Sequence, residues 1–129
     1  MMKQLLIALM LLVTATAASA EWTRAGENDE FIQYVDKATI RRDGNLVKMW
    51  GLSDNMKVEV FAGQSFLSIR SLSEYDCKDE KERVLSESGF SGHMGKGTIS
   101  YNDEDIKKWF AVAPGTIAET LWKIACGKK

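Results

Sequence analysis

The side chains that most often carry out chemistry in proteins are scarce in this sequence. Its 129 residues include one histidine and two cysteines. His93 lies in the glycine-rich stretch Gly92-His93-Met94-Gly95, without the Gly-x-Ser-x-Gly motif that exposes a nucleophilic serine. Any Ser-His-Asp arrangement would have to be built on this imidazole, and we interpret it instead as a surface side chain.

Three further patterns share residue types with known binding motifs but lack their spacing. Gly95-Lys96-Gly97 lacks the first glycine of a phosphate-binding loop and the Ser or Thr after its lysine. Asn102-Asp103-Glu104-Asp105 lacks the alternating ligands and the distant glutamate of an EF-hand loop, which favours a solvated turn. Asp76 with Arg83 or Lys78 is interpreted as a surface ion pair. The sequence therefore predicts no catalytic, cofactor-binding or metal site.

The tryptophans are the remaining candidates for ligand contacts. Trp50, Trp109 and Trp122 each lie beside apolar residues in a predicted strand or helix, so we expect them to pack in the core. Trp22 lies near the predicted start of the mature chain and could be an exposed contact.

The charge pattern excludes some partners. The formal net charge is -1, and charges of both signs are interspersed without a basic block. A nucleic-acid-binding protein would normally show a basic excess, so nucleic acid is not an expected partner. The same pattern gives no support for binding to membranes or heparin-like polymers through a basic patch.

The first 20 residues have the features of a secretory signal peptide. Lys3 precedes the apolar run Leu5 to Val13, and Ala18-Ser19-Ala20 supplies the small residues of a cleavage site. The run is shorter than the roughly 20 residues that span a bilayer, so we expect no membrane span after cleavage. We predict a signal peptide at 1–20 and one domain at 21–129. No cysteine at the cleavage site could accept a lipid, which favours a periplasmic or secreted protein and leaves surface association open.

Strands dominate the predicted domain, and one helix ends it. The Asp43-Gly44 pair predicts a hairpin turn. In the longest predicted strand, an apolar face is expected to hold Leu67, Ile69, Tyr75 and Cys77. Hydrophobic and β-branched patterns predict strands at 31–40, 46–52, 57–62, 65–77, 84–86, 98–101 and 109–112.

A helix is predicted directly after the single proline, Pro114. Thr116 and Glu119 match a capping box, and Gly127 is a plausible stop. Its apolar stripe consists of Ile117, Leu121 and Ile124, with Ala118, Trp122 and Ala125 beside it.

The two cysteines are expected to form a disulfide in an exported protein, although two free buried thiols are the alternative. Joining Cys77 to Cys126 closes a loop of about 50 residues and contributes roughly 4 kcal/mol in the chain-entropy description. The fold class is therefore α+β: an antiparallel sheet of about six strands, with a C-terminal helix packed on one face and tethered by the disulfide. Such a sheet is roughly 25 Å wide and one helix covers about 10 Å, so we expect an uncovered surface used for dimerisation or for a partner.

Several short motifs follow one another along the mature chain. The most specific is Glu74-Tyr75-Asp76-Cys77, matched to a cysteine that closes a C-terminal helix. The others are Tyr34-x-Asp36, Val47-x-Met49-Trp50, Arg83, Met94-Gly95-x-Gly97, Trp109, Val112-Ala113-Pro114-Gly115-Thr116 and Leu121-Trp122-x-x-x-Cys126. In this order the motifs resemble the bacterial surface-adhesin protein E family.

The resemblance implies an antiparallel sheet carrying a C-terminal helix held by this disulfide. It also implies an exported bacterial protein whose namesake is an adhesin for host extracellular proteins. The namesake type is a surface lipoprotein, and this sequence lacks the lipid-accepting cysteine. The resemblance brings no catalytic residues with it.

Two functional hypotheses follow. The first is a non-catalytic, adhesin-like binding protein without a cofactor, which docks a host extracellular or periplasmic protein through its sheet face or loops. The second is a small periplasmic ligand carrier or enzyme with a cavity between helix and sheet. A closed interface between the helix and the strands would favour the first, and a polar cavity containing His93 or several carboxylates would favour the second.

Overall fold

The computed structural model describes residues 20–129, so the predicted signal peptide lies outside the described residues except for Ala20. Among the residues described, no helix has the length and apolar character needed to cross a membrane.

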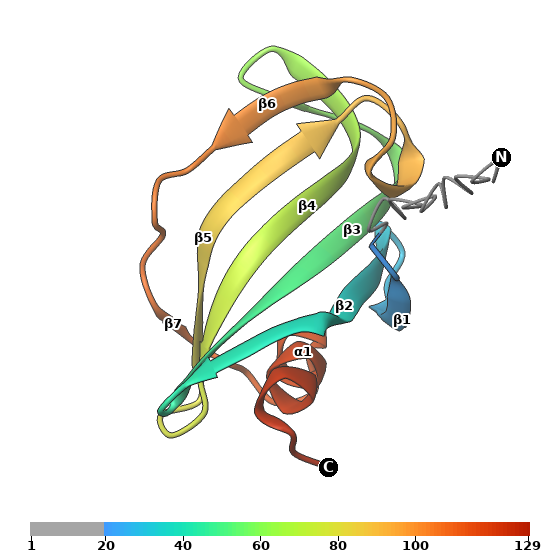
Figure 1. Cartoon of the computed structure of the whole chain (residues 1–129). Coiled ribbons are helices and arrows are strands. Elements are labelled where there is room, and N and C mark those ends of the chain that lie inside the picture. Colours follow the sequence, from blue (N-terminus) through green and yellow to red (C-terminus); the bar gives the residue numbers. More distant parts are fainter. Residues whose placement is uncertain (1–19) are drawn as a thin grey trace, which may run out of the picture.

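The domain is an antiparallel sheet with one helix on one face (Figure 1). Strands β1 to β6 pair in chain order, and β7 pairs with the opposite end of β5. This arrangement confirms the predicted α+β class and the sheet of about six strands. The elements are β1 Thr23–Glu27, β2 Phe31–Asp43, β3 Leu46–Phe61, β4 Gln64–Asp76, β5 Lys81–Phe90, the short 3-10 helix η1 His93–Gly95, β6 Ile99–Asp103, β7 Phe110–Ala111 and α1 Ile117–Cys126.

The β2–β3 hairpin turns where the sequence predicted. Asp43 pairs with Leu46, and Gly44 between them has a φ of 60°, a conformation that glycine adopts without steric cost. The following strand differs from the prediction, since β3 is continuous where the sequence indicated two strands. The polar Ser53 and Asp54 that interrupt the apolar pattern stay paired with both neighbouring strands. Three extra residues after Asp54 then form a bulge rather than a break.

The expected apolar face of β4 is only half correct. Tyr75 is 2% exposed and packs in the core with Cys77 beside it, whereas Leu67 and Ile69 are only half-buried. The buried residues at that end of the strand are Phe66 and Ser68 on the opposite face. The helix covers only the Tyr75 end of β4, while the Ser68 end is covered on its other face by the segment around η1.

Helix α1 begins and ends at the predicted caps. The Thr116 Oγ1 accepts a hydrogen bond from the Glu119 N–H at 3.2 Å, and Gly127 closes the helix in the left-handed conformation with φ 67°. The side that faces the sheet is rotated from the predicted stripe. It is formed by Trp122, Ala125 and Cys126, packed against Val35, Val47, Met49 and Tyr75.

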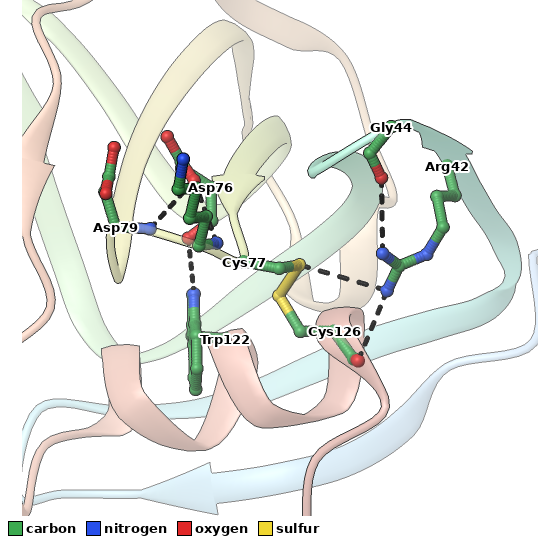
Figure 2. The surroundings of a disulfide bond; sticks show 8 residues. Arg42, Gly44, Asp76, Cys77, Asp79, Trp122 and Cys126 are labelled. Atoms are coloured by element: carbon green, nitrogen blue, oxygen red, sulfur yellow. Dashed lines mark hydrogen bonds between the residues drawn. A yellow bond between two sulfur atoms is a disulfide. The ribbon is translucent and has the colours of Figure 1, made fainter.

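Three connections hold the C-terminal end of the helix to the sheet (Figure 2). The disulfide Cys77–Cys126 forms as predicted, with a Cα–Cα distance of 5.6 Å. The Trp122 indole N–H donates to the Asp76 carbonyl at 2.9 Å. From the β2–β3 hairpin, the Arg42 guanidinium donates to the Cys126 carbonyl at 3.3 Å, where a cation also complements the helix dipole.

Candidate binding surfaces

His93 lies beside an aspartate and a serine, but the arrangement anchors a loop. Its Nδ1 is 3.0 Å from the Asp54 Oδ1, which also accepts the Met94 N–H at 3.0 Å. The Ser68 Oγ donates to the Gly92 carbonyl at 2.7 Å and accepts the Gly95 N–H at 2.9 Å. Because the Ser68 hydroxyl is committed on both sides and its residue is 0% exposed, a substrate has no access to it. His93 itself is exposed, as predicted.

The acidic stretch 102–105 begins in the last two residues of β6 and continues into the solvated segment after it, where its own Lys107 folds back on Asp103. The Asp103 Oδ2 accepts from the Lys107 Nζ at 2.6 Å, and the Asp103 Oδ1 accepts the Asp105 N–H at 2.9 Å. The hydrogen bond from Lys107 lowers the pKa of Asp103. Among residues 20–129, no three His, Cys, Asp or Glu side chains gather in a way that could hold a metal ion.

The ion pair expected for Asp76 is wrong. The Asp76 Oδ1 instead accepts the backbone N–H groups of Lys78 and Asp79, each at 3.0 Å, and so shapes the β4–β5 turn. Arg83 pairs with Glu74, its neighbour across β4 and β5, through hydrogen bonds of 2.9 and 2.6 Å. Closeness along the chain suggested Arg83 or Lys78 as the partner of Asp76, but the strand register places Arg83 opposite Glu74.

The interface between α1 and the sheet is closed. Trp122 is 7%, Ala125 4% and Cys126 6% exposed, and the facing Val35 and Val47 are both 0% exposed. This packing matches the arrangement expected for a binding protein and differs from the polar cavity expected for a ligand carrier.

Two of the three tryptophans predicted to be in the core lie elsewhere. Trp50 follows the buried Met49 along β3, so it points to the opposite side of the sheet, here called the helix-free face. It is half-buried, as is Trp109, whose ring lies 4.4 Å from the Arg83 guanidinium carbon. Of the three, only Trp122 confirms the expectation of core packing.

Arg70 is held between two aromatic rings on the helix-free face. Its guanidinium carbon lies 5.4 Å from the Trp50 ring centroid and 5.2 Å from that of Phe90. These are cation–π distances, and they fix the orientation of an exposed cation.

A groove crosses this face from β2 to β4. A hollow of about 520 Å³ adjoins a second of about 310 Å³, and Thr39 and Trp50 line both. A register shift between Asp36 and Arg41 interrupts the β2–β3 ladder there, and the Thr39 Oγ1 accepts the Trp50 N–H at 3.0 Å in its place. We call the two hollows together the cross-strand groove; its lining residues are Ala20, Trp22, Asp36, Ala38, Thr39, Arg41, Lys48, Trp50, Arg70 and Leu72. Trp22, expected as an exposed contact, is half-buried in its wall.

A second candidate surface is apolar and lies at the far end of the sheet from the disulfide. The β3–β4 hairpin turns at Ala62-Gly63, and the Ser100 Oγ of β6 donates to the Ser65 carbonyl at 2.6 Å, which holds β6 beside the hairpin (Figure 1). Large apolar side chains remain in solvent on both elements. We call them the hairpin patch: Met56, Val58, Val60, Phe61 and Ile99, each between 49% and 68% exposed.

Burial perturbs two carboxylates of β5. Desolvation raises the pKa of Glu82, which pairs with the buried Tyr75 across β4 and β5, from 4.5 to about 7. Burial and then the nearby Asp103 also raise the pKa of Glu87. Neither carboxylate lines the cross-strand groove, so neither shift indicates acid–base chemistry there.

These features define a class of fold: a small domain with an antiparallel sheet and a C-terminal helix linked by a disulfide. The chain belongs to the Surface-adhesin protein E family, whose model matches residues 22–127. Membership confirms the family resemblance found in the sequence motifs. No curated protein matches the sequence.

Solved structures of Haemophilus influenzae protein E have a similar fold. Crystal form II is 17% identical to this chain with a TM-score of 0.67, and the match covers 87% of this chain and 91% of that one. A second structure of the same protein is 17% identical with a TM-score of 0.66, covering 87% and 88% of the two chains. Protein E from non-typeable Haemophilus influenzae is 17% identical with a TM-score of 0.64, covering 87% and 79%.

Proposed function

We propose that this protein is an exported, non-catalytic, adhesin-like binding protein that docks a protein partner through the hairpin patch. Membership of the surface-adhesin family supports binding rather than catalysis. The observation that carries the docking site is the exposure of Val60 and Phe61, consecutive residues on the two sides of β3, and of Ile99 on the adjoining β6. Large apolar side chains exposed on neighbouring elements are a common mark of protein interaction sites.

The geometry of the patch suits a protein partner. Strand β6 ends the β1–β6 path of the sheet, so one of its sides offers unpaired backbone groups to an incoming strand. The Phe61 ring packs on Tyr101 with a centroid distance of 5.6 Å, which gives the patch a fixed aromatic base. A host extracellular protein and a periplasmic protein both fit this chemistry, and the place where the exported protein resides decides between them.

The test combines localisation with capture. The native protein is located by fractionation, and the purified protein is used to capture candidates from a periplasmic extract and from a panel of purified host matrix proteins. We expect one saturable partner, whose affinity falls about tenfold or more with Val60→Asp. The matched control is Ile106→Asp, which places the same charge at another exposed apolar residue, 62% exposed and outside the patch.

Three results would contradict the proposal: the absence of a specific partner in both pools, equal loss of binding in the two variants, or a stable dimer in light scattering that Val60→Asp dissociates. The last result would assign the patch to a second copy of the chain.

A further inference from the structure

We infer that the cross-strand groove binds an acidic oligosaccharide, one whose sugar units carry carboxylates. This site is separate from the proposed protein-docking function, because the groove and the hairpin patch share no residue.

The charge of the groove opposes that of the whole protein. Arg41, Lys48 and Arg70 line it, although the chain has a formal net charge of -1. Among residues 20–129, none of these three cations forms an ion pair. A row of unpaired cations along one depression attracts an extended anion.

The carboxylates near the groove are already engaged. Asp36 is 6% exposed, and its Oδ1 accepts the Ala38 N–H at 3.1 Å. Glu74, the cross-strand neighbour of Lys48, is held by Arg83 at 2.6 Å. Lys48 and Arg70 are therefore left to face solvent or a ligand, whereas the Arg41 Nη1 already donates to the Ala38 and Ile40 carbonyls at 3.0 and 2.9 Å.

Arg70 is preorganised for one carboxylate. The rings of Trp50 and Phe90 hold its guanidinium, so little conformational freedom is lost when the N–H groups bind an acid. A guanidinium can donate two parallel hydrogen bonds to a carboxylate, which gives direction as well as attraction.

The aromatic lining of the groove favours a sugar over an acidic peptide. Trp22 and Trp50 line the larger hollow, and the C–H face of a sugar can pack against an aromatic ring. Beyond Val35 the outer side of β2 has no partner strand, so an acidic peptide is included in the test below. Two adjoining hollows of about 520 and 310 Å³ provide room for more than one saccharide unit.

Export is expected to change one end of the groove. Ala20 lies in its wall, and cleavage before Glu21 would remove this residue and leave a free α-amino group on Glu21, next to Trp22 in the chain. The binding experiment therefore uses the exported protein, purified after its N-terminus has been determined.

The test titrates three matched oligomers into the exported protein by calorimetry: tetragalacturonate, neutral maltotetraose and the peptide tetraglutamate. We expect saturable binding of tetragalacturonate, with the other two about tenfold weaker or more. Arg70→Gln and Lys48→Gln should each weaken tetragalacturonate binding by about fivefold to tenfold. Lys108→Ala, which removes a positive charge outside the groove, should leave the affinity unchanged.

A melting curve of each variant establishes that it is folded, and both groove substitutions lie at a solvent-accessible surface where loss of fold is not expected. The inference is overturned if tetragalacturonate does not bind saturably. It is also overturned if maltotetraose or tetraglutamate binds equally well, or if Lys108→Ala weakens binding as much as Arg70→Gln does. None of these results depends on the hairpin patch, so failure here and failure of the protein-docking proposal are distinguishable.

Discussion

The two faces of the sheet use tryptophan in different ways. On the helix-covered face, Trp122 is 7% exposed, its indole N–H is bonded to Asp76, and the disulfide lies four residues further on at Cys126. On the helix-free face, Trp50 stays half-buried beside the exposed cation Arg70. Burial and a covalent link stabilise the first face, whereas the second keeps aromatic and charged groups accessible. The same residue type therefore belongs to the core on one side and lines an accessible groove on the other.

Removing each tryptophan in turn tests this contrast most directly. Trp122→Ala deletes a buried side chain and leaves the Asp76 carbonyl without its partner, so we expect a loss of about 4–5 kcal/mol in the free energy of unfolding. Trp50→Ala removes a half-buried ring and should cost about 1–2 kcal/mol. Urea denaturation of both variants measures the difference. Equal costs would show that the two faces do not differ in this way.

The disulfide should contribute nearly as much as Trp122 to the free energy of unfolding, and only in the oxidised protein. Cys77→Ser with Cys126→Ser opens a loop whose ends are 49 residues apart, and we expect a loss of about 4 kcal/mol. The control is the wild type after full reduction, which should then match the double variant. If the oxidised wild type is no more stable than the variant, the covalent link does not stabilise the helix-covered face.

A smaller effect of pH is expected from Glu82, which pairs with Tyr75 on the helix-covered side of the sheet. Its pKa is raised by desolvation from 4.5 to about 7 in the folded protein. The folded state therefore holds the Glu82 proton more strongly than the unfolded state does. The stabilisation that protonated Glu82 adds to the free energy of unfolding is present below about pH 4.5 and is lost as the pH rises through 7.

Glu82→Gln removes this dependence. After allowing for partial exposure, which screens the effect, we expect the variant to be about 1 kcal/mol more stable than the wild type at pH 8 and equal to it at pH 4. Glu104→Gln, at an exposed residue, is the control. It should leave the change of the free energy of unfolding with pH the same as in the wild type. A wild type whose stability rises between pH 5 and 8 relative to Glu82→Gln would contradict the assignment.

The smallest effect is expected on the helix-free face. Arg70→Gln removes an exposed cation–π contact, which is worth about 0.5–1 kcal/mol to stability. Thermal unfolding should therefore change little, while tetragalacturonate binding weakens by about fivefold to tenfold. A loss of stability above about 2 kcal/mol would mean that Arg70 serves the fold rather than a ligand.

Much of the fold could be predicted because its signals are local. The Asp43-Gly44 turn, the Thr116–Glu119 cap and the Gly127 stop depend on residues close together in the chain. The Cys77–Cys126 pairing follows from there being two cysteines in a domain expected to be exported. Strand β1, with its polar sequence TRAGE, carries no such signal and was not predicted. Its pairing with β2 and its contacts with α1 define it.

The candidate surfaces could not be predicted in the same way. A basic patch could not be recognised from the sequence, because Arg41, Lys48 and Arg70 are separated along the chain and mixed with acidic residues. Strand pairing places them along one groove. The hairpin patch likewise depends on β6 lying against the β3–β4 hairpin, a contact between distant segments.

The type of fold, the disulfide and the family could all be predicted from the sequence. Turn residues and helix caps act over short distances, and two cysteines allow one pairing within the chain. The tertiary structure alone decided which side of the sheet each tryptophan occupies and which charges lie together. Strand residues alternate between faces, so whether Trp50 or Met49 lies beneath the helix depends on where the helix docks. Docking is set by the disulfide, the Trp122 hydrogen bond and the packing around them, which exist only in the folded chain.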